Sequence, residues 1–292
     1  MAGAAELQHK LLEEQNADGG WSYESGSSWT EPTAFALLAL EAHGSKGGAY
    51  QRGCAWLSRK QGADGGWPPQ PSVTTSTWVT SLVLVALPEA DLASSDYQRG
   101  IEWTVRQIRP EVPLLERLIS RMQGSPRIEE TGGGSPWFPS TASWIGPTVM
   151  SVLALSEAAR RNSDKKLTGY VTQAQQYILS RRCVDGGWNH GGTSFRSQNA
   201  ESYPEMTGMA LLALNRTLDS GLSISIQCAE NFLAHPGSIE GLSWLQLGLL
   251  KHGRDRLSIE TDLPCRTTRD TSLRLLALAA HSSSNRLLTQ SS

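Results

Sequence analysis

The apolar positions of this chain fall into two alternating patterns. In the first, hydrophobic residues recur on one side of a helix, as Leu7, Leu11 and Leu12 do within residues 4–15. In the second, a run is apolar nearly all round and reads Thr-x-x-x-x-x-Ala-Leu. A helix without a polar face must be buried on more than one side. The alternation therefore predicts outer helices that cover inner ones.

Five runs of the second kind share this form, and a sixth is a looser copy. They span residues 33–40, 80–87, 148–155, 207–214 and 271–278, with 242–250 as the looser copy. Six hairpins predict an all-α fold, a closed (α/α)6 toroid, because an open solenoid would need polar end repeats that the sequence lacks. We expect one toroid domain over residues 1–284, with an insertion at about 108–135, a short last outer helix at about 255–260, and a disordered tail over 285–292.

The letters Asp-Gly-Gly-Trp stand three times between an outer and an inner run, at residues 18–21, 64–67 and 185–188. Paired glycines permit a tight reversal after a helix, and an aspartate can accept hydrogen bonds from nearby amides. The tryptophan can fill the space between neighbouring hairpins. We interpret the motif as a structural joint rather than as an active site, and we assign Trp137 to a joint of the same kind.

Aromatic residues also precede four of the inner runs. They are Trp29, Trp78, Trp144 and Tyr203. In a closed ring these side chains would surround one end of the barrel, where their π faces could bind a substrate or stabilise a cation. The alternative is that they only pack against the core.

Composition excludes some classes of function. With 26 basic and 28 acidic residues the net charge is −2, which gives no electrostatic basis for binding nucleic acid. The four cysteines lack CxxC spacing and the N-terminus lacks a signal segment, so we expect a cytoplasmic protein. No apolar run approaches the roughly 20 residues that span a bilayer, so membrane contact would be peripheral.

The insertion has apolar residues at helical spacing among arginines, namely Leu115, Leu118, Ile119 and Met122. It is either a lid or membrane-docking helix, or a connector packed on the body.

The Gln-x-x-Asp-Gly-Gly-Trp units before Thr-Ala-x-x-x-Leu-Ala-Leu runs resemble the repeats of squalene-hopene and oxidosqualene cyclases and of protein prenyltransferase β subunits. The resemblance covers about residues 15–278. It implies an (α/α)6 barrel whose inner-helix ends surround an apolar, aromatic-lined cavity for isoprenoid chains.

In the cyclases of this family, an Asp-x-Asp-Asp-Thr-Ala segment opens one inner helix and its middle aspartate donates a proton. Residues 29–34 of this chain take that place, so the resemblance puts Glu31 at the proton donor and matches Thr33 and Ala34 outright. Trp29 and Pro32 stand where the family has two supporting aspartates. Protonating an alkene needs a carboxyl group that is both neutral and strongly acidic, so Glu31 alone would be too weak.

Two further carboxylates stand at or near the same place in other units. Glu205 precedes the fourth run, and Asp270 lies one step later in the last. Together with Glu31 they are the candidate catalytic acids and bases. The alternative is that each carboxylate only complements the positive end of its own helix.

Arginines and metal-ligand types complete the candidates. Arg196, Arg266 and Arg269 could bind a diphosphate, or they are solvated surface residues. Asp262, Cys265 and His190 are ligand types for zinc, but their spacing does not match the prenyltransferase pattern. We predict no cofactor, with zinc or magnesium as the less favoured alternative.

The favoured function is therefore a terpene cyclase-like or prenyltransferase-like enzyme whose partner is an isoprenoid or other apolar small molecule. One alternative is a non-catalytic toroid that binds an isoprenoid, another lipid or a partner, since a lone toroid lacks the second domain of the large cyclases. A weaker alternative is a carbohydrate-active toroid, because tryptophans and carboxylates at one end of a barrel also suit sugars.

Overall fold

The inner helices of the protein begin where the threonine runs predict them. The computed structural model describes residues 3–108, 132–192, 194–195, 198–214, 221–254 and 261–289. The inner helices are α2 (Thr30–Ala42), α4 (Val79–Ala86), α7 (Ile145–Asn162), α9 (Pro204–Ala213), α11 (Ile239–Lys251) and α12 (Thr268–Leu278). The outer helices are α1 (Ala4–Glu13), α3 (Gly48–Ser58), α5 (Ser95–Gln107), α8 (Lys165–Ser180) and α10 (Leu222–Leu233).

Short elements connect these helices. They are the 3-10 helix η1 (Glu89–Asp91), the strand pair β1 (Ser135–Pro136) and β2 (Ser143–Trp144), the strand pair β3 (Ser194–Phe195) and β4 (Gln198–Asn199), and the terminal helix α13 (Arg286–Thr289). Both strand pairs are antiparallel. The outer helix expected at 255–260 and nearly all of the insertion expected at 108–135 lie outside the described residues.

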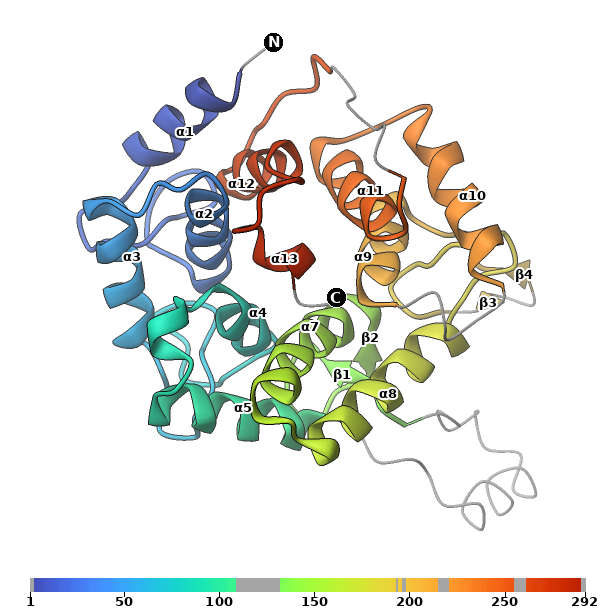
Figure 1. Cartoon of the computed structure of the whole chain (residues 1–292), viewed down its shortest axis with the longest axis horizontal. Helices are drawn as coiled ribbons and strands as arrows, with labels where there is room; N and C mark the ends of the chain where they lie inside the picture. Colours follow the sequence, from blue (N-terminus) through green and yellow to red (C-terminus); the bar gives the residue numbers. More distant parts are fainter. Residues whose placement is uncertain are drawn as a thin grey trace.

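The inner helices form a closed ring, with α12 packed against both α11 and α2, and the outer helices surround it (Figure 1). Hydrogen bonds join the last inner helix, α12, to the segments that flank the first, α2, at both ends of the pair. The amide of Thr268 donates to the carbonyl of Tyr23 at 2.7 Å, and His43 Nε2 lies 2.9 Å from the carbonyl oxygen of Leu275. The all-α toroid predicted from the sequence is confirmed.

The Asp-Gly-Gly-Trp joint works through its aspartate and its tryptophan. Asp18 Oδ1 accepts hydrogen bonds from the Gly20 amide at 3.0 Å and from Ser28 Oγ at 2.6 Å, while Oδ2 accepts from Trp56 Nε1 at 2.8 Å. Burial alone would raise the pKa of Asp18, but these hydrogen bonds outweigh it and hold the pKa below its usual value. The joint therefore ties a loop to the next outer helix, as a structural role requires.

The tryptophan of the joint connects the preceding outer helix to the inner helix that follows. Trp21 Nε1 donates to the carbonyl of Leu11 at 2.7 Å, and the Trp21 amide donates to Thr33 Oγ1 at 2.9 Å. The same amide-to-threonine bond recurs from Trp67 to Thr80 and from Trp188 to Thr207. In these three runs the opening threonine therefore satisfies a buried amide.

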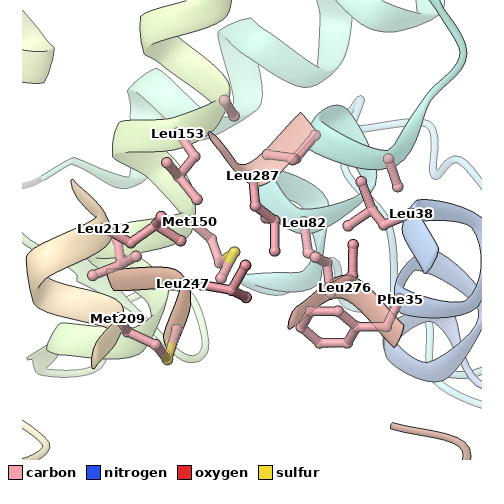
Figure 2. Packing of buried hydrophobic residues seen from close by; sticks show 14 of the residues in the cluster. Phe35, Leu38, Leu82, Met150, Leu153, Met209, Leu212, Leu247, Leu276 and Leu287 are labelled. Carbon is pink, nitrogen blue, oxygen red and sulfur yellow. The ribbon is translucent and has the colours of Figure 1, made fainter. Parts of the chain in front are cut away.

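The centre of the ring is a packed apolar core. Side chains from all six inner helices meet there, including Phe35, Leu82 and Met150 (Figure 2). The tail predicted to be disordered contributes to it: α13 lies inside the ring, and Leu287 is fully buried among the inner helices (Figures 1 and 2). Arg286 donates to the carbonyl of Leu87, at the C-terminal end of α4. The terminal helix therefore closes the barrel at the C-terminal ends of the inner helices.

None of the helices among the described residues is both long and apolar enough to cross a membrane.

Candidate functional site: the N-terminal rim

The N-terminal ends of the inner helices all lie at one end of the barrel, which we call the N-terminal rim. Each joint places its loop on the start of the preceding inner helix through a backbone hydrogen bond. The amides of Thr30, Trp78, Ile145 and Thr268 donate to the carbonyls of Pro69, Trp137, His190 and Tyr23, respectively, at 2.7–3.2 Å. The position equivalent to these donors in α9 is Pro204, which has no amide hydrogen to donate. Among the described residues, four of the six inner-helix starts are thus linked to a neighbouring loop, and α9 cannot donate such a bond.

Four inner helices have an aromatic residue at the N-cap. They are Trp29 in α2, Trp78 in α4, Trp144 in α7 and Tyr203 in α9. Each of the predicted aromatic residues thus lies at the start of an inner helix. These residues therefore lie at the N-terminal rim.

Three of these rings join with two others into one continuous series, the aromatic arc, formed by Trp78, Trp137, Trp144, His190 and Tyr203. Successive ring centroids lie 4.7, 6.5, 5.4 and 5.4 Å apart. Most of the pairs are edge to face, the arrangement that aromatic quadrupoles favour. The arc follows the rim from α4 past α7 to α9. Trp29 stands apart from it and pairs with Tyr23 at 5.6 Å.

We call the residue whose amide donates to the threonine of the following inner helix the joint residue. The members of the arc alternate between two structural positions, which are the N-cap of an inner helix and the second residue after a joint residue. The assignment of Trp137 to a joint was wrong. The Ser135 amide donates to Thr148 Oγ1 at 2.9 Å, so Ser135 holds the joint position and Trp137 lies two residues beyond it. His190 stands in the corresponding place after Trp188. Thr80 follows the joint residue Trp67 by 13 residues, and Thr148 follows Ser135 by the same number. This spacing is the sequence signal that identifies Ser135, and not Trp137, as the joint residue.

The rings of the arc are partly open to solvent. Tyr203 is 40% exposed, and His190 is exposed as well. Of the five, only Trp78 is packed against the apolar core cluster. Core packing therefore does not account for the other four residues of the arc.

The opposite side of the rim is charged. Glu31 is only 12% exposed, accepts a hydrogen bond from the Tyr23 hydroxyl, and forms an ion pair with Arg269 at 3.3 Å. The other end of the same guanidinium pairs with Glu240. We call Tyr23, Glu31, Arg269 and Glu240 the charged cluster. Burial and the neighbouring Glu31 raise the pKa of Tyr23, so its phenol keeps its proton and remains a hydrogen-bond donor to the carboxylate.

Glu205 differs from Glu31. It lies half-buried in the first turn of α9, and in the part of the chain that the structure describes it has no hydrogen-bond or ion-pair partner. Helices α9 and α11 approach so closely that a Cβ on Gly208 would lie 2.3 Å from the backbone of Trp244. Glu205 and Glu240 therefore occupy matching first turns of two tightly packed helices.

The other predicted site residues lie elsewhere or already have a structural role. Asp270 belongs to a capping box: its Oδ2 accepts from the amides of Arg266 and Thr267, and Thr267 Oγ1 accepts from the Asp270 amide. The Arg266 side chain is exposed. A further arginine of the same helix, Arg274, is buried along α12, where burial lowers its pKa. Arg196 lies outside the described residues.

The residue types proposed for a metal do not converge. His190 belongs to the aromatic arc, whereas Asp262 and Cys265 line a separate depression near Lys10. Within the described ranges, no group of three histidine, cysteine or acidic side chains is placed to hold a metal ion.

Comparison with known proteins identifies the fold. No family model matches the chain, and no curated protein matches it. Among solved structures, an α-amylase from Clostridium perfringens aligns at 9% identity with a TM-score of 0.64, covering 96% of this chain and 98% of the other. An endo-β-1,4-glucanase from Acetobacter xylinum aligns at 12% identity and a TM-score of 0.62, with coverage of 96% and 98%. A type II terpene cyclase from Scytonema aligns at 13% identity and a TM-score of 0.54, with coverage of 95% and 78%.

The fold is an α/α toroid. At these identities the similarity extends to the fold alone, and both carbohydrate-active enzymes and terpene cyclases occur on it. The predicted toroid fold is supported, whereas the predicted terpenoid-cyclase resemblance gains no advantage over the carbohydrate-active alternative.

Proposed function

We propose that the N-terminal rim binds an uncharged, oxygen-bearing isoprenoid and catalyses proton transfer on it. The observation that carries this proposal is the aromatic arc. Its partly exposed rings offer apolar faces to a hydrocarbon and π electrons to a developing cation. The repeat motifs, which resemble those of the terpenoid cyclases, support an isoprenoid as the class of substrate.

The charges of the rim favour a substrate without a diphosphate. The carboxylates at the helix starts are Glu31, Glu205, Glu240 and Asp270, against Arg266 and Arg269 in the same turns. Arg269 is already paired with two of these carboxylates. A diphosphate would need clustered, available cations, so transfer from a prenyl diphosphate is the less favoured reaction.

The environments of the two glutamates suggest different roles. Glu31 already accepts a hydrogen bond from Tyr23 and pairs with Arg269, an arrangement that suits a base or a stabiliser of positive charge. Glu205 has no such partners and is the better candidate for the acid. Protonating an isolated alkene requires a carboxyl group with activating partners, so we assign Glu205 to the more basic oxygen of an epoxide or alcohol.

The direct test is to incubate the protein with C15 to C30 isoprenols and their epoxides and to detect cyclised or rearranged products by mass spectrometry. We expect Glu205→Gln to abolish product formation and Glu31→Gln to reduce it. Glu230→Gln is the matched control, because Glu230 lies on outer helix α10 and pairs with Arg254. Full activity of Glu205→Gln would disprove the assignment of the acid. Binding of an isoprenoid without any turnover would instead favour the non-catalytic toroid.

A carbohydrate-active toroid is the second candidate. The observation that favours it is the pair of carboxylates Glu205 and Glu240 on adjacent helix starts, close to exposed rings that can stack on sugars. Release of reducing ends from β-glucan or α-glucan, lost in Glu205→Gln, would favour this function over the first. If the protein releases no reducing ends from β-glucan or from α-glucan, it is not a hydrolase of these glycans.

A further inference from the structure

The joints provide an internal frame in which equivalent positions of the outer helices can be compared. Each has a glycine with φ between 90° and 100° whose missing Cβ makes room for the backbone of the following outer helix. The glycines Gly19, Gly65, Gly133 and Gly186 face Arg52, Arg99, Gln173 and Ile224, respectively. One helical turn further along stand Trp56, Trp103, Tyr177 and Cys228. The fourth outer helix of this series, α10, thus has a cysteine where the others have a large ring.

In the first two joints this ring completes the hydrogen bonding of the aspartate. Trp56 Nε1 donates to Asp18 Oδ2 at 2.8 Å, and Trp103 Nε1 donates to Asp64 Oδ2 at 3.0 Å. In the third joint glycine stands in place of the aspartate, and the Tyr177 hydroxyl donates to the carbonyl of Ser143. Only the fourth joint of this series combines the aspartate, Asp185, with the loss of the ring.

A cavity of about 530 Å³ lies where that ring is missing. Its walls include Asp185, Cys228, Ile224 and Phe232. Asp185 Oδ1 accepts from the Gly187 amide at 3.1 Å and Oδ2 accepts from Ser202 Oγ at 2.7 Å. Each carboxylate oxygen can accept two hydrogen bonds, so Oδ2 retains the capacity that Trp56 and Trp103 use in the other joints.

We propose that this cavity binds a tryptophan side chain of a partner polypeptide, with the indole N–H donating to Asp185. The two intact joints show the chemistry that satisfies such an aspartate, which is an indole lying against a glycine pair. The surroundings indicate a polypeptide: Ile224 is 59% exposed and Val184, next to Asp185 in the chain, is 75% exposed. Exposed apolar side chains beside a pocket are typical of protein interfaces, and tryptophan is a frequent anchor there. None of the residues that line this cavity belongs to the aromatic arc.

The test uses three small probes and one peptide on the full-length protein. N-acetyltryptophanamide should give a saturable signal in ligand-observed NMR. Its N1-methyl analogue should bind about tenfold more weakly, because it has lost the hydrogen bond to a charged acceptor. N-acetylleucinamide should not bind. A short peptide with a central tryptophan flanked by leucines should bind at least about tenfold more tightly than N-acetyltryptophanamide, since it also covers Ile224 and Val184.

Two variants locate the binding. Cys228→Trp should rebuild the internal contact, abolish binding of the probe and raise Tm. Ile224→Ser changes an exposed residue, so the variant folds even if Cys228→Trp does not, and it should weaken the peptide several-fold. Equal affinity of the N1-methyl analogue, or unchanged binding by either variant, would overturn the assignment of the site. A peptide no tighter than N-acetyltryptophanamide would overturn the assignment of a polypeptide partner.

Discussion

The two ends of the barrel are built from the same six helices and yet differ in almost every property. At the C-terminal end, α13 enters the ring, Leu287 is completely buried, and Asn285 Nδ2 donates to the carbonyl of Leu276 at 2.9 Å. At the N-terminal rim, the rings of the aromatic arc are partly exposed and Glu205 has no partner among the described residues. The closed end thus adds buried packing to the fold, whereas the rim leaves side chains open to solvent, where we propose that ligands bind.

The largest expected effect comes from opening the closed end. Leu287→Ala should lower the free energy of unfolding by about 2–5 kcal/mol, because it leaves a cavity in a fully packed core. Urea denaturation followed by circular dichroism measures the change. Leu278→Ala is the control, since Leu278 is 44% exposed and its truncation should cost less than about 1 kcal/mol. Equal losses would mean that α13 does not seal the barrel.

At the rim the same kind of truncation should affect binding more than stability. Trp144→Leu removes the middle ring of the arc and should weaken binding of a C15 isoprenol at least about tenfold, while the free energy of unfolding changes by less than about 1 kcal/mol. Isothermal titration calorimetry gives the affinity. Phe138→Leu, next to the arc and 50% exposed, should leave affinity unchanged. A large loss of stability in Trp144→Leu would mean that this ring packs in the core and is not mainly a binding residue.

The charged cluster should show a smaller effect on stability. Arg269→Met leaves the carboxylates of Glu31 and Glu240 close together without their shared cation, and we expect a loss of about 1 kcal/mol. Adding Glu31→Gln should restore part of it, because one of the two like charges is then gone. Arg266→Met, whose exposed side chain lies outside the cluster, should have no effect on the denaturation midpoint.

The smallest expected effect concerns Lys251, at the C-terminal end of α11, where burial lowers its pKa from 10.5 to about 8. Below pH 8 the lysine is charged in both states, so the folded protein bears the cost of burying the charge. Between pH 8 and 10.5 only the unfolded chain keeps the proton, and stability therefore rises with pH across this window.

Lys251→Met should remove that dependence. At pH 7 it should stabilise the protein, by less than about 1 kcal/mol because solvent screens the half-buried ammonium. The gain should shrink as the pH approaches 10. Urea denaturation at pH 7 and pH 10 measures both values, with the exposed Lys166→Met as the control. A gain that is the same at the two pH values would contradict burial of the charge.

The fold could be predicted because its requirements are local. A buried amide at each joint needs a threonine hydroxyl at the start of the next inner helix, and the pairs Trp21 with Thr33 and Trp67 with Thr80, 12 and 13 residues apart, display this need directly in the sequence. The N-cap aromatic residues follow from the same frame. Trp137 was misassigned because its joint has lost both the aspartate and the tryptophan, which left the 13-residue spacing as the only signal.

Other parts of the site depend on which helices become neighbours. Glu240 was not predicted, since its importance arises only when α11 and α12 bring it to the Arg269 that also pairs with Glu31. Tyr23 was missed for the same reason. The closed end was missed because one apolar side chain, Leu287, follows a run of serines that is typical of a disordered tail.

The hydrogen bond from Thr268 to Tyr23 has a consequence for folding kinetics. It joins residues that are 245 positions apart (268 minus 23), so the ring cannot close until nearly the whole chain is available. Local hairpins can form early, but contacts of such sequence separation form slowly. During synthesis one side of the first inner helix therefore stays exposed until the last inner helix packs against it. A chaperone that binds exposed apolar surface would act before this closure.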